Sequence, residues 1–189
     1  MKGKTKIYYM SFKSLNESNL EQLKQNEKKY MQILCEYAFK DYLRDSKEND
    51  LQDMPTGRTE HISKSHSNGY VVIGISPRPI GCDIEKVRTD WTREDLKKRI
   101  CFYLDSDSQL AVLNSSDPQR NAIIAWTRKE SYFKVHQTRC VSKEFEIASL
   151  YETVHGKHMK FVSIQVDKDM ILTCYIDIKS DVEWIQVLV

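Results

Sequence analysis

The sequence predicts an α+β fold, and three features of its pattern support this prediction. Residues 18–44 repeat apolar side chains at the spacing of an amphipathic helix. A second helix is predicted after Asp117 and Pro118, a favoured pair at a helix start. Short runs rich in β-branched residues lie before and after these helices, as is typical of strands. With 189 residues, of which 40% are hydrophobic, the chain can form one or two domains with their own cores.

The N-terminal part is expected to contain a strand, a long helix, a loop and a second strand. The first strand is predicted at residues 7–12, and the helix at about 18–44, with the polar residue 18 or 19 as its cap. The apolar stripe of this helix consists of Leu20, Leu23, Tyr30, Leu34, Tyr37 and Ala38. Residues 45–59 are polar and contain proline and glycine, so they predict a loop before the strand at 70–75.

The C-terminal part is expected to contain two helices and five strands. After a turn at residues 76–79 and a strand that carries two acids, Thr89 or Asp90 is expected to cap a helix. The buried face of that helix would consist of Trp91, Leu96, Ile100 and Tyr103. A loop at 114–118 leads to the second helix. The remaining strands are expected to be antiparallel, with a hairpin turn at 167–169, and are predicted at residues 144–150, 159–166, 170–178 and 184–189.

Two acidic side chains lie two residues apart on the first strand of this part. Alternate residues of a strand face opposite sides, so Asp83 and Glu85 point together. The opposite face carries Ile80, Cys82 and Ile84. Magnesium binds one or two carboxylates together with waters and phosphate oxygens, and this pair could supply those carboxylates. An isolated Asp-x-Glu is also common on a solvated edge strand, so the pair alone does not decide the function.

The second helix offers a further acid beside two lysines. Glu130 and Lys134 are four residues apart and share one helix face, with Lys129 next to them. Such a pair can be an exposed ion pair that contributes only about 0.2–0.5 kcal/mol. Together with the acidic strand, however, the helix provides three carboxylates and a lysine where a magnesium-bound phosphate could sit.

Composition excludes several other classes of protein. The formal net charge of +2 and the lack of an aromatic-basic motif argue against nucleic-acid binding. Five cysteines without a CxxC spacing predict neither a disulfide framework nor a zinc site. No long apolar segment predicts a membrane span, and the start of the chain lacks a signal-peptide core, so a cytoplasmic location is expected.

Two stretches of the chain resemble the signature motifs of one enzyme family. Residues 81–85 read G-C-D-I-E, and residues 126–134 read W-T-R-K-E-S-Y-F-K. They are similar to the G-I/V-D-I/V-E strand and the W-T/S-x-K-E-S/A-x-x-K helix of the 4'-phosphopantetheinyl transferase superfamily. Ser65 and His66, just ahead of an apolar strand, resemble a third family element. Arg58 and the glycine before it are similar to the Gly-Lys-Pro turn of that family.

The resemblance also carries an expectation about architecture. About eighty residues precede the acidic strand, which is similar to the layout of the larger, Sfp-type members. It implies two similar α/β halves in one chain that form a pseudodimer, each a small, mainly antiparallel sheet packed on a long helix. Residues 1–79 would form the N-terminal half, and residues 80–189 the C-terminal half with the metal-binding acids. A monomer is expected.

The resemblance implies a specific reaction and specific roles. The 4'-phosphopantetheine moiety of coenzyme A would be transferred to a serine of an apo acyl or peptidyl carrier protein, with release of adenosine 3',5'-bisphosphate. Asp83, Glu85 and Glu130 would hold magnesium or manganese. The catalytic residues would be Glu130, which activates the serine hydroxyl, Lys134 and Asp83. Coenzyme A would be bound by Arg58, Ser65, His66, Lys129 and Lys134, with protonated His66 on the 3'-phosphate.

Two other functions fit part of the same pattern. A metal-dependent phosphohydrolase or nuclease also uses clustered acids and a lysine, and it would cleave its substrate without a carrier acceptor. A degenerate, non-catalytic relative would bind coenzyme A or a carrier protein without turnover. Binding that persists after magnesium is removed would favour this last function.

Overall fold

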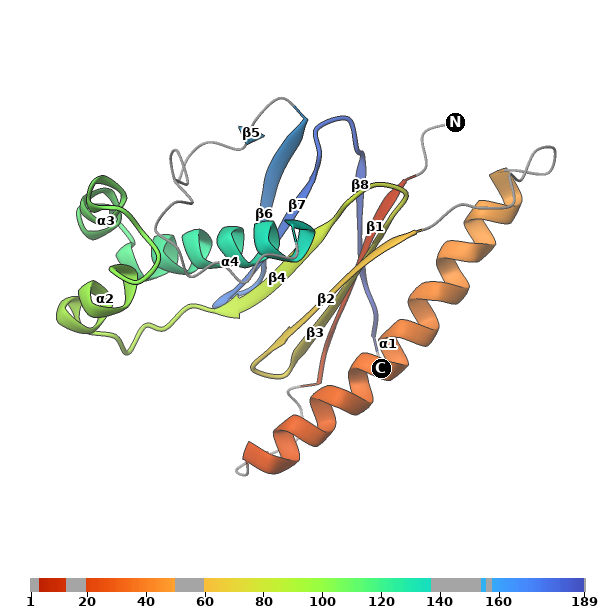
Figure 1. Cartoon of the computed structure of the whole chain (residues 1–189). Helices are drawn as coiled ribbons and strands as arrows, with labels where there is room; N and C mark the ends of the chain where they lie inside the picture. Colours follow the sequence, from red (N-terminus) through yellow and green to blue (C-terminus); the bar gives the residue numbers. More distant parts are fainter. Residues whose placement is uncertain (1–3, 13–19, 50–59, 137–153, 156–157, 189) are drawn as a thin grey trace.

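The protein has a mixed α+β architecture built on two four-stranded sheets. The computed structural model describes residues 4–12, 20–49, 60–136, 154–155 and 158–188. Within these ranges the chain forms eight strands and four helices, with the longest helix at one end and a pair of short helices at the other (Figure 1). None of the described helices is long and apolar enough to cross a membrane.

The first sheet has the strand order β2-β3-β1-β8. Its strands are β1 (Thr5–Ser11), β2 (His61–Ser67), β3 (Tyr70–Ser76) and β8 (Val182–Gln186). The strands predicted at 7–12 and 70–75 are confirmed as β1 and β3, which pair antiparallel. The last strand departs from the prediction, because β8 runs parallel to β1 rather than antiparallel to its neighbour. Side-chain alternation identifies a strand but carries no information about its partner or direction.

The long helix α1 (Leu20–Asn49) covers the outer face of the first sheet. Two residues of the predicted apolar stripe, Leu34 and Ala38, are buried against the outward residues of β1 and β3. Tyr42, one helical turn further along, is buried there as well. The Lys6 Nζ of β1 lies 2.8 Å from Asp41 Oδ2 and fastens the C-terminal part of the helix to the sheet. The helix extends beyond the predicted end at residue 44, and its proposed cap at residue 18 or 19 lies outside the described residues.

The second sheet is antiparallel throughout and has the order β4-β7-β6-β5. Its strands are β4 (Gly81–Lys86), β5 (Val154–His155), β6 (Met159–Asp167) and β7 (Met170–Asp177). The strands predicted at 159–166 and 170–178 and the turn between them are confirmed. The strand predicted at 144–150 lies outside the described residues.

Three helices lie between β4 and β5: α2 (Arg93–Ile100), α3 (Ser106–Leu113) and α4 (Pro118–His136). The start of α4 is confirmed, because Asp117 Oδ1 accepts the Arg120 N–H at 3.1 Å. The predicted cap of α2 at residue 89 or 90 is wrong. Thr92 caps this helix and forms a reciprocal capping box with Asp95. The helix α3, which Asp105 caps, was not predicted from the sequence.

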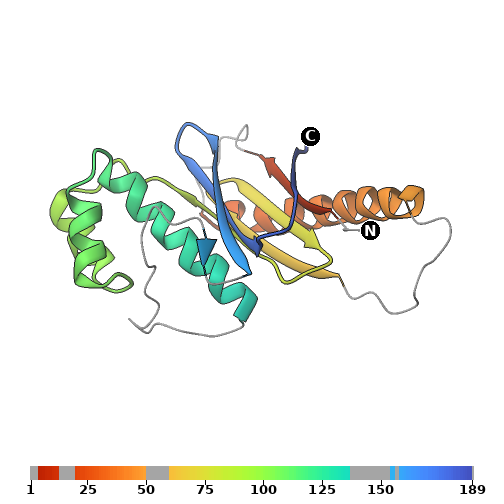
Figure 2. The ribbon, with the colours of Figure 1, turned by 90° about the horizontal axis from the view of Figure 1, so that it is seen from above.

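The main core lies between the two sheets. It contains inward residues of both sheets, among them Ile7, Val72, Cys82, Ile84, Leu172 and Cys174. Both sheets follow one connection pattern: a strand, a helix and a hairpin whose last strand lies beside the first strand. In the first sheet these elements are β1-α1-β2-β3, and in the second they are β4-α4-β6-β7, with α2 and α3 inserted before α4. Figure 2 shows α1 and the α2–α3 pair at opposite ends of the molecule.

Candidate functional site

The candidate site lies at the seam where β2 of the first sheet meets β4 of the second. These two edge strands are not joined by a backbone ladder. Instead, alternate serines of β2 reach β4 with their side chains: Ser63 Oγ accepts the Cys82 N–H at 2.8 Å, Ser65 Oγ donates to Asp83 Oδ1 at 2.7 Å, and Ser67 Oγ donates to Glu85 Oε2 at 2.8 Å. We call Ser63, Ser65 and Ser67 the serine row.

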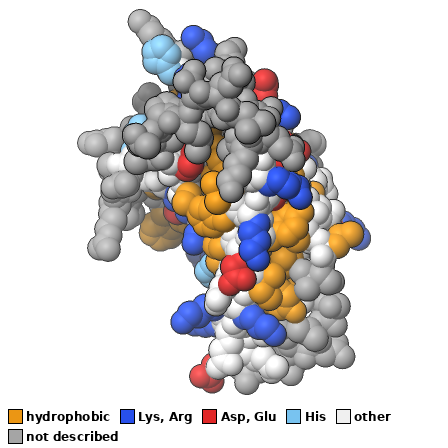
Figure 3. All heavy atoms as spheres, turned by 90° about the vertical axis from the view of Figure 1, so that its right-hand side faces the viewer, with side chains coloured by type: hydrophobic (Ala, Val, Ile, Leu, Met, Phe, Trp, Pro, Cys, Tyr) orange, Lys and Arg blue, Asp and Glu red, His pale blue; other side chains and the backbone are white. Residues whose placement is uncertain are grey.

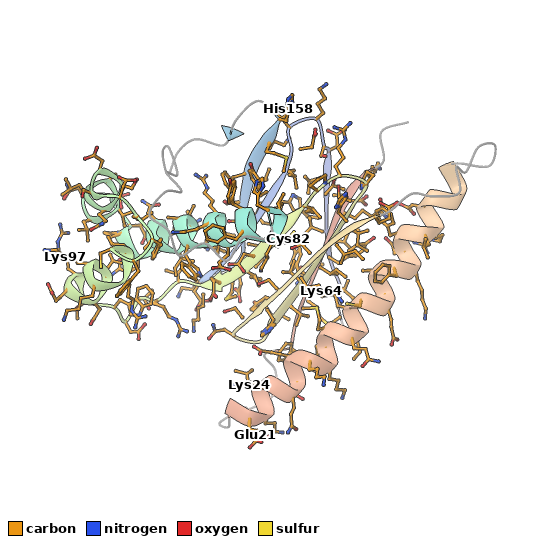
Figure 4. All side chains as sticks on the ribbon, in the orientation of Figure 1. Glu21, Lys24, Lys64, Cys82, Lys97 and His158 are labelled. Carbon is orange, nitrogen blue, oxygen red and sulfur yellow. The ribbon has the colours of Figure 1, made fainter. Side chains whose placement is uncertain are left out.

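The two acids of β4 point to the same face, as the alternation predicted. Cys82 and Ile84 are in the core between the sheets, so Asp83 and Glu85 face α4. Asp83 is only 5% exposed, whereas Glu85 is partly exposed. Cys82 marks this strand at the centre of the molecule in Figure 4.

A close contact between α4 and β4 brings the second set of site residues to the acids. A Cβ atom added to Gly81 would lie 1.8 Å from the Ser131 carbonyl oxygen, so only glycine allows the helix to pack this closely. The buried Thr127 and Thr173 hydroxyls, 2.7 Å apart, fix the helix on the neighbouring strand β7. The contact places Lys134 Nζ 2.8 Å from both Asp83 Oδ1 and the Cys82 carbonyl oxygen.

The ionised forms of Asp83, Glu85 and Glu130 are all disfavoured in the folded protein. Burial raises the pKa of Asp83 above its ordinary value, although Lys134 and Ser65 oppose this shift. Burial also raises the pKa of Glu85, with a further increase from the charge of Asp83, while the Ser67 hydrogen bond lowers it. The pKa of Glu130 is raised by burial and by Asp83, against the effects of Lys134 and Lys129. These carboxylates therefore lie in one electrostatic neighbourhood, in which burial outweighs the positive charge of the nearby lysines.

The donor set of this neighbourhood fits a hard divalent cation. Asp83 Oδ2 is buried and has no hydrogen-bond partner among the described residues, so one carboxylate oxygen of the site is left for a ligand. Among the described residues, no group of three or more His, Cys, Asp or Glu side chains is arranged as a metal cage, so Asp83, Glu85 and Glu130 do not form a three-ligand site as they stand. Magnesium does not need such a cage, because it usually takes one or two carboxylates and completes its shell with waters and phosphate oxygens.

The remaining predicted site residues have different positions. Ser65 is in the site, but it bonds Asp83 directly. His66 is on the other side of β2 and lies beside α1, with its Nδ1 atom 3.0 Å from Glu27 Oε2. Lys129 is buried and donates to the Tyr103 carbonyl oxygen at 3.3 Å, on the α2–α3 side of α4. Arg58 lies outside the described residues.

Ser67 was not predicted as a site residue, and the strand that carries it, β2, was not predicted. The segment HISKSHS of β2 lacks an apolar alternation because one of its faces meets β4 through hydroxyls rather than hydrocarbon. The available signal was the regular spacing of Ser63, Ser65 and Ser67 just before a buried strand. Period-two spacing of small polar residues indicates a strand as well as apolar spacing does.

A cavity of about 380 Å³ opens beside Glu85. It starts at Glu85 and extends along α4 past Trp126 and Ile123 toward α2. Its other walls combine aromatic and cationic side chains, including Trp91 and Arg99, whose guanidinium carbon lies 4.4 Å from the indole centroid. A substrate held at Glu85 thus has an adjoining space that suits a chain with both apolar and polar groups.

Replacing Ser67 with Ala is expected to weaken magnesium binding by roughly 10- to 100-fold, a typical cost of losing a group that orients a metal ligand. The change removes the hydrogen bond from Ser67 to Glu85. In the wild-type protein this bond holds the Glu85 carboxylate and lowers its pKa. Calorimetric titration with magnesium would measure the loss. Ser115→Ala is the matched control, because among the described residues that hydroxyl bonds only the Val112 carbonyl near the end of α3. Equal magnesium affinity in both variants would show that the serine row does not position the acids.

The family model of the 4'-phosphopantetheinyl transferase superfamily matches residues 79–175, a little over half of the 189-residue chain. The match begins just before β4 and ends in β7, so it includes both the acidic strand and α4. All four strands of the first sheet lie outside it. No curated protein matches the chain.

Proposed function

Because the chain belongs to the 4'-phosphopantetheinyl transferase superfamily, we propose that it transfers the 4'-phosphopantetheine moiety of coenzyme A to a serine of an apo acyl or peptidyl carrier protein. Adenosine 3',5'-bisphosphate is the second product. The observation that carries this proposal is the meeting of β4 and α4, which brings Lys134 to Asp83 and places Glu130 in the field of the same acid. This arrangement has the charges that a diphosphate and its metal require.

Asp83, Glu85 and Glu130 are the residues that would hold magnesium or manganese. The free Oδ2 atom of Asp83 and the raised pKa values of all three acids support this assignment. The bound cation supplies neutralisation of the negative charge on the diphosphate. The hydroxyls of Ser65 and Ser67 hold the two acids of β4 on the side where the cation and the diphosphate would bind.

Glu130 and Lys134 are the residues that act on the reacting groups. The serine oxygen of the carrier attacks the phosphorus next to the pantetheine, and the phosphoanhydride bond breaks toward the nucleotide. Glu130 accepts the serine proton directly or through one water, as a carboxylate within hydrogen-bond reach can do. Lys134 stabilises the charge that builds on the phosphoryl oxygens. Its two hydrogen bonds to β4 hold the ammonium group beside the acids.

The nucleotide end is proposed to lie on the first sheet, near His66, with Ser65 at the boundary to the acids. Arg58 and Lys129 stay predictions as coenzyme A ligands. For Lys129 the proposal requires a change of position, since its ammonium group is bonded to the Tyr103 carbonyl.

The shared connection pattern of the two sheets supports a pseudodimer of two similar halves in a monomeric chain. We propose that the halves correspond to residues 1–79 and 80–189. The strand β8 is an exchange between them, because it leaves the second half and adds to the first sheet. The cytoplasm is the proposed location, and no nucleic acid is needed for the reaction.

Intact mass spectrometry of apo carrier proteins tests this function directly. After incubation with the protein, coenzyme A and magnesium, a carrier that is a substrate gains the mass of one phosphopantetheine. Glu130→Gln is expected to lower the rate by roughly 10²- to 10⁴-fold, the usual contribution of a general base. Bound coenzyme A without any mass gain would favour the non-catalytic alternative. Hydrolysis of coenzyme A without a carrier would favour the phosphohydrolase.

A further inference from the structure

A buried carboxylate on α1 contacts the one histidine of the proposed nucleotide site. Glu27 is only 8% exposed, and its Oε2 atom lies 3.0 Å from Nδ1 of His66. The histidine side chain itself is 56% exposed. Burying a carboxylate is costly unless it is paired, so this contact is the compensation that the structure provides for Glu27.

The position of His66 ties this pair to the acid site. On β2 the two neighbouring serines, Ser65 and Ser67, bond Asp83 and Glu85. His66 stands between them on the opposite side of the strand, where α1 packs. A ligand that reaches from the acids across the end of this strand would therefore meet the imidazole within the length of one or two residues.

The surroundings of the pair are basic. Lys64 shares the strand face of His66, and Lys24 lies one helical turn before Glu27. Both lysines are exposed, and Figure 4 labels Lys24 near the start of α1 and Lys64 on β2. These charges favour an anionic ligand, and the buried Glu27 is directed at the imidazole rather than at solvent.

We propose that Glu27 is a positioning residue that sets how His66 meets a phosphate of the nucleotide. This inference rests on the proposed function and adds to it a residue that contributes to recognition of the nucleotide. With Nδ1–H donated to Glu27, the ring is held in one orientation, and only Nε2 is left for the ligand. When Nε2 carries a hydrogen, it can donate it to a phosphate oxygen. Glu27 touches the histidine and not the ligand.

Calorimetric binding of two nucleotides to the full chain separates this role from a general effect on folding. Adenosine 3',5'-bisphosphate and adenosine 5'-phosphate differ by the 3'-phosphate alone. Wild-type protein is expected to prefer the bisphosphate. Glu27→Gln is expected to reduce that preference roughly 10- to 100-fold, the size of a lost charge-assisted hydrogen bond, without changing the affinity for the monophosphate. His66→Gln should remove the same preference.

A matched control and a double variant make the test decisive. Glu21→Gln removes the same charge from the exposed start of α1 and is expected to leave the preference unchanged. Because Glu27 acts through His66, the double variant should lose no more than His66→Gln alone. In nitrogen-correlated NMR spectra, the His66 signals should change in Glu27→Gln and stay as in wild type in Glu21→Gln.

Several results would overturn the inference. These are wild-type protein without a preference for the bisphosphate, equal loss of both nucleotides in Glu27→Gln, additive losses in the double variant, or unchanged His66 signals in Glu27→Gln. The proposed function fails separately. A chain that shows the predicted nucleotide pattern but modifies no carrier keeps the role of Glu27 and loses the assignment as a transferase.

Discussion

Asp83→Asn is expected to abolish magnesium-dependent transfer, with a loss on the order of 10³-fold or more, because several kcal/mol of charge stabilisation disappear with the metal ligand. The amide keeps an oxygen for the hydrogen bonds from Ser65 and Lys134, so the fold of the site should persist. It removes the negative charge that the cation requires. Rate measurements at saturating coenzyme A, with circular dichroism as a check of folding, would show this effect.

The stability of the folded protein is expected to depend on pH and magnesium through the same acids. Folding raises the pKa of Asp83, Glu85 and Glu130, so their ionised forms are disfavoured in the folded state. In metal-free protein this destabilisation is absent below the ordinary values of 3.8 for aspartate and 4.5 for glutamate, and it grows as pH rises through the raised values. Above them, added magnesium should raise the melting temperature of wild-type protein but not of Asp83→Asn. An equal magnesium effect in both proteins would refute the assignment of Asp83 as a ligand.

Gly81→Ala is expected to be the most damaging single substitution for stability. Its Cβ atom would lie 1.8 Å from the Ser131 carbonyl oxygen and 2.8 Å from the carbonyl carbon, both of which belong to the helix backbone. Relief requires α4 to move away from β4, which would open the contact that carries Lys134 to Asp83. The loss should be at least about 3 kcal/mol, at the upper end for overpacked cores, and activity should fall with it.

Gly74→Ala is the matched comparison for this prediction. Its Cβ atom would meet the side-chain atoms Cys82 Sγ at 2.6 Å and Ile80 Cδ1 at 2.8 Å, which can shift more easily than a helix backbone. Urea unfolding of the two variants and wild type would give the free energies. The close approach of α4 to β4 would be contradicted if Gly81→Ala were no less stable than Gly74→Ala.

The sequence predicts the elements whose burial has a simple period. The alternation of the acidic strand placed Cys82 and Ile84 in the core and Asp83 and Glu85 toward the helix, as the structure has them. The start of α4 was also predictable, since Asp117 and Pro118 are a local signal that needs no tertiary information.

The elements that were missed depend on partners far away in the chain. The strand β2 has a polar pattern because its serines bond another strand, and nothing in its own sequence names that partner. The direction of β8 is set by its addition to β1, more than 170 positions earlier. For α2, the prediction chose the polar residues 89 and 90 as the cap. The residue that caps the helix is Thr92, because the acid three residues later, Asp95, completes a capping box with it.

The candidate site was predictable to the extent that its residues form local motifs. Asp83, Glu85, Glu130 and Lys134 come from two short stretches, and the structure brings Asp83 and Lys134 together. The role of Ser65 toward Asp83, the presence of Ser67 and the contact of His66 with Glu27 arise only when the two sheets and α1 pack.

The outer surface of α1 differs from the surroundings of the site. Ile33, Tyr37 and Leu43 are exposed on this helix, and hydrophobic side chains mix with lysines and arginines on the face that it occupies (Figure 3). Asp83 and Glu85, by contrast, are held by serines of β2, and Asp83 also by Lys134 of α4. Changes on the outer surface of α1 should therefore leave the orientation of the acids unaffected.

The serine row has a consequence for how the chain can be divided. The segment that matches the family carries every proposed metal ligand, yet two of those ligands are held by hydroxyls from a strand outside that segment. A fragment cut to the matched residues would keep the acids and lose the groups that aim them. Both halves thus contribute residues to one site. A chimera in which the N-terminal half is exchanged is therefore expected to have a different metal affinity.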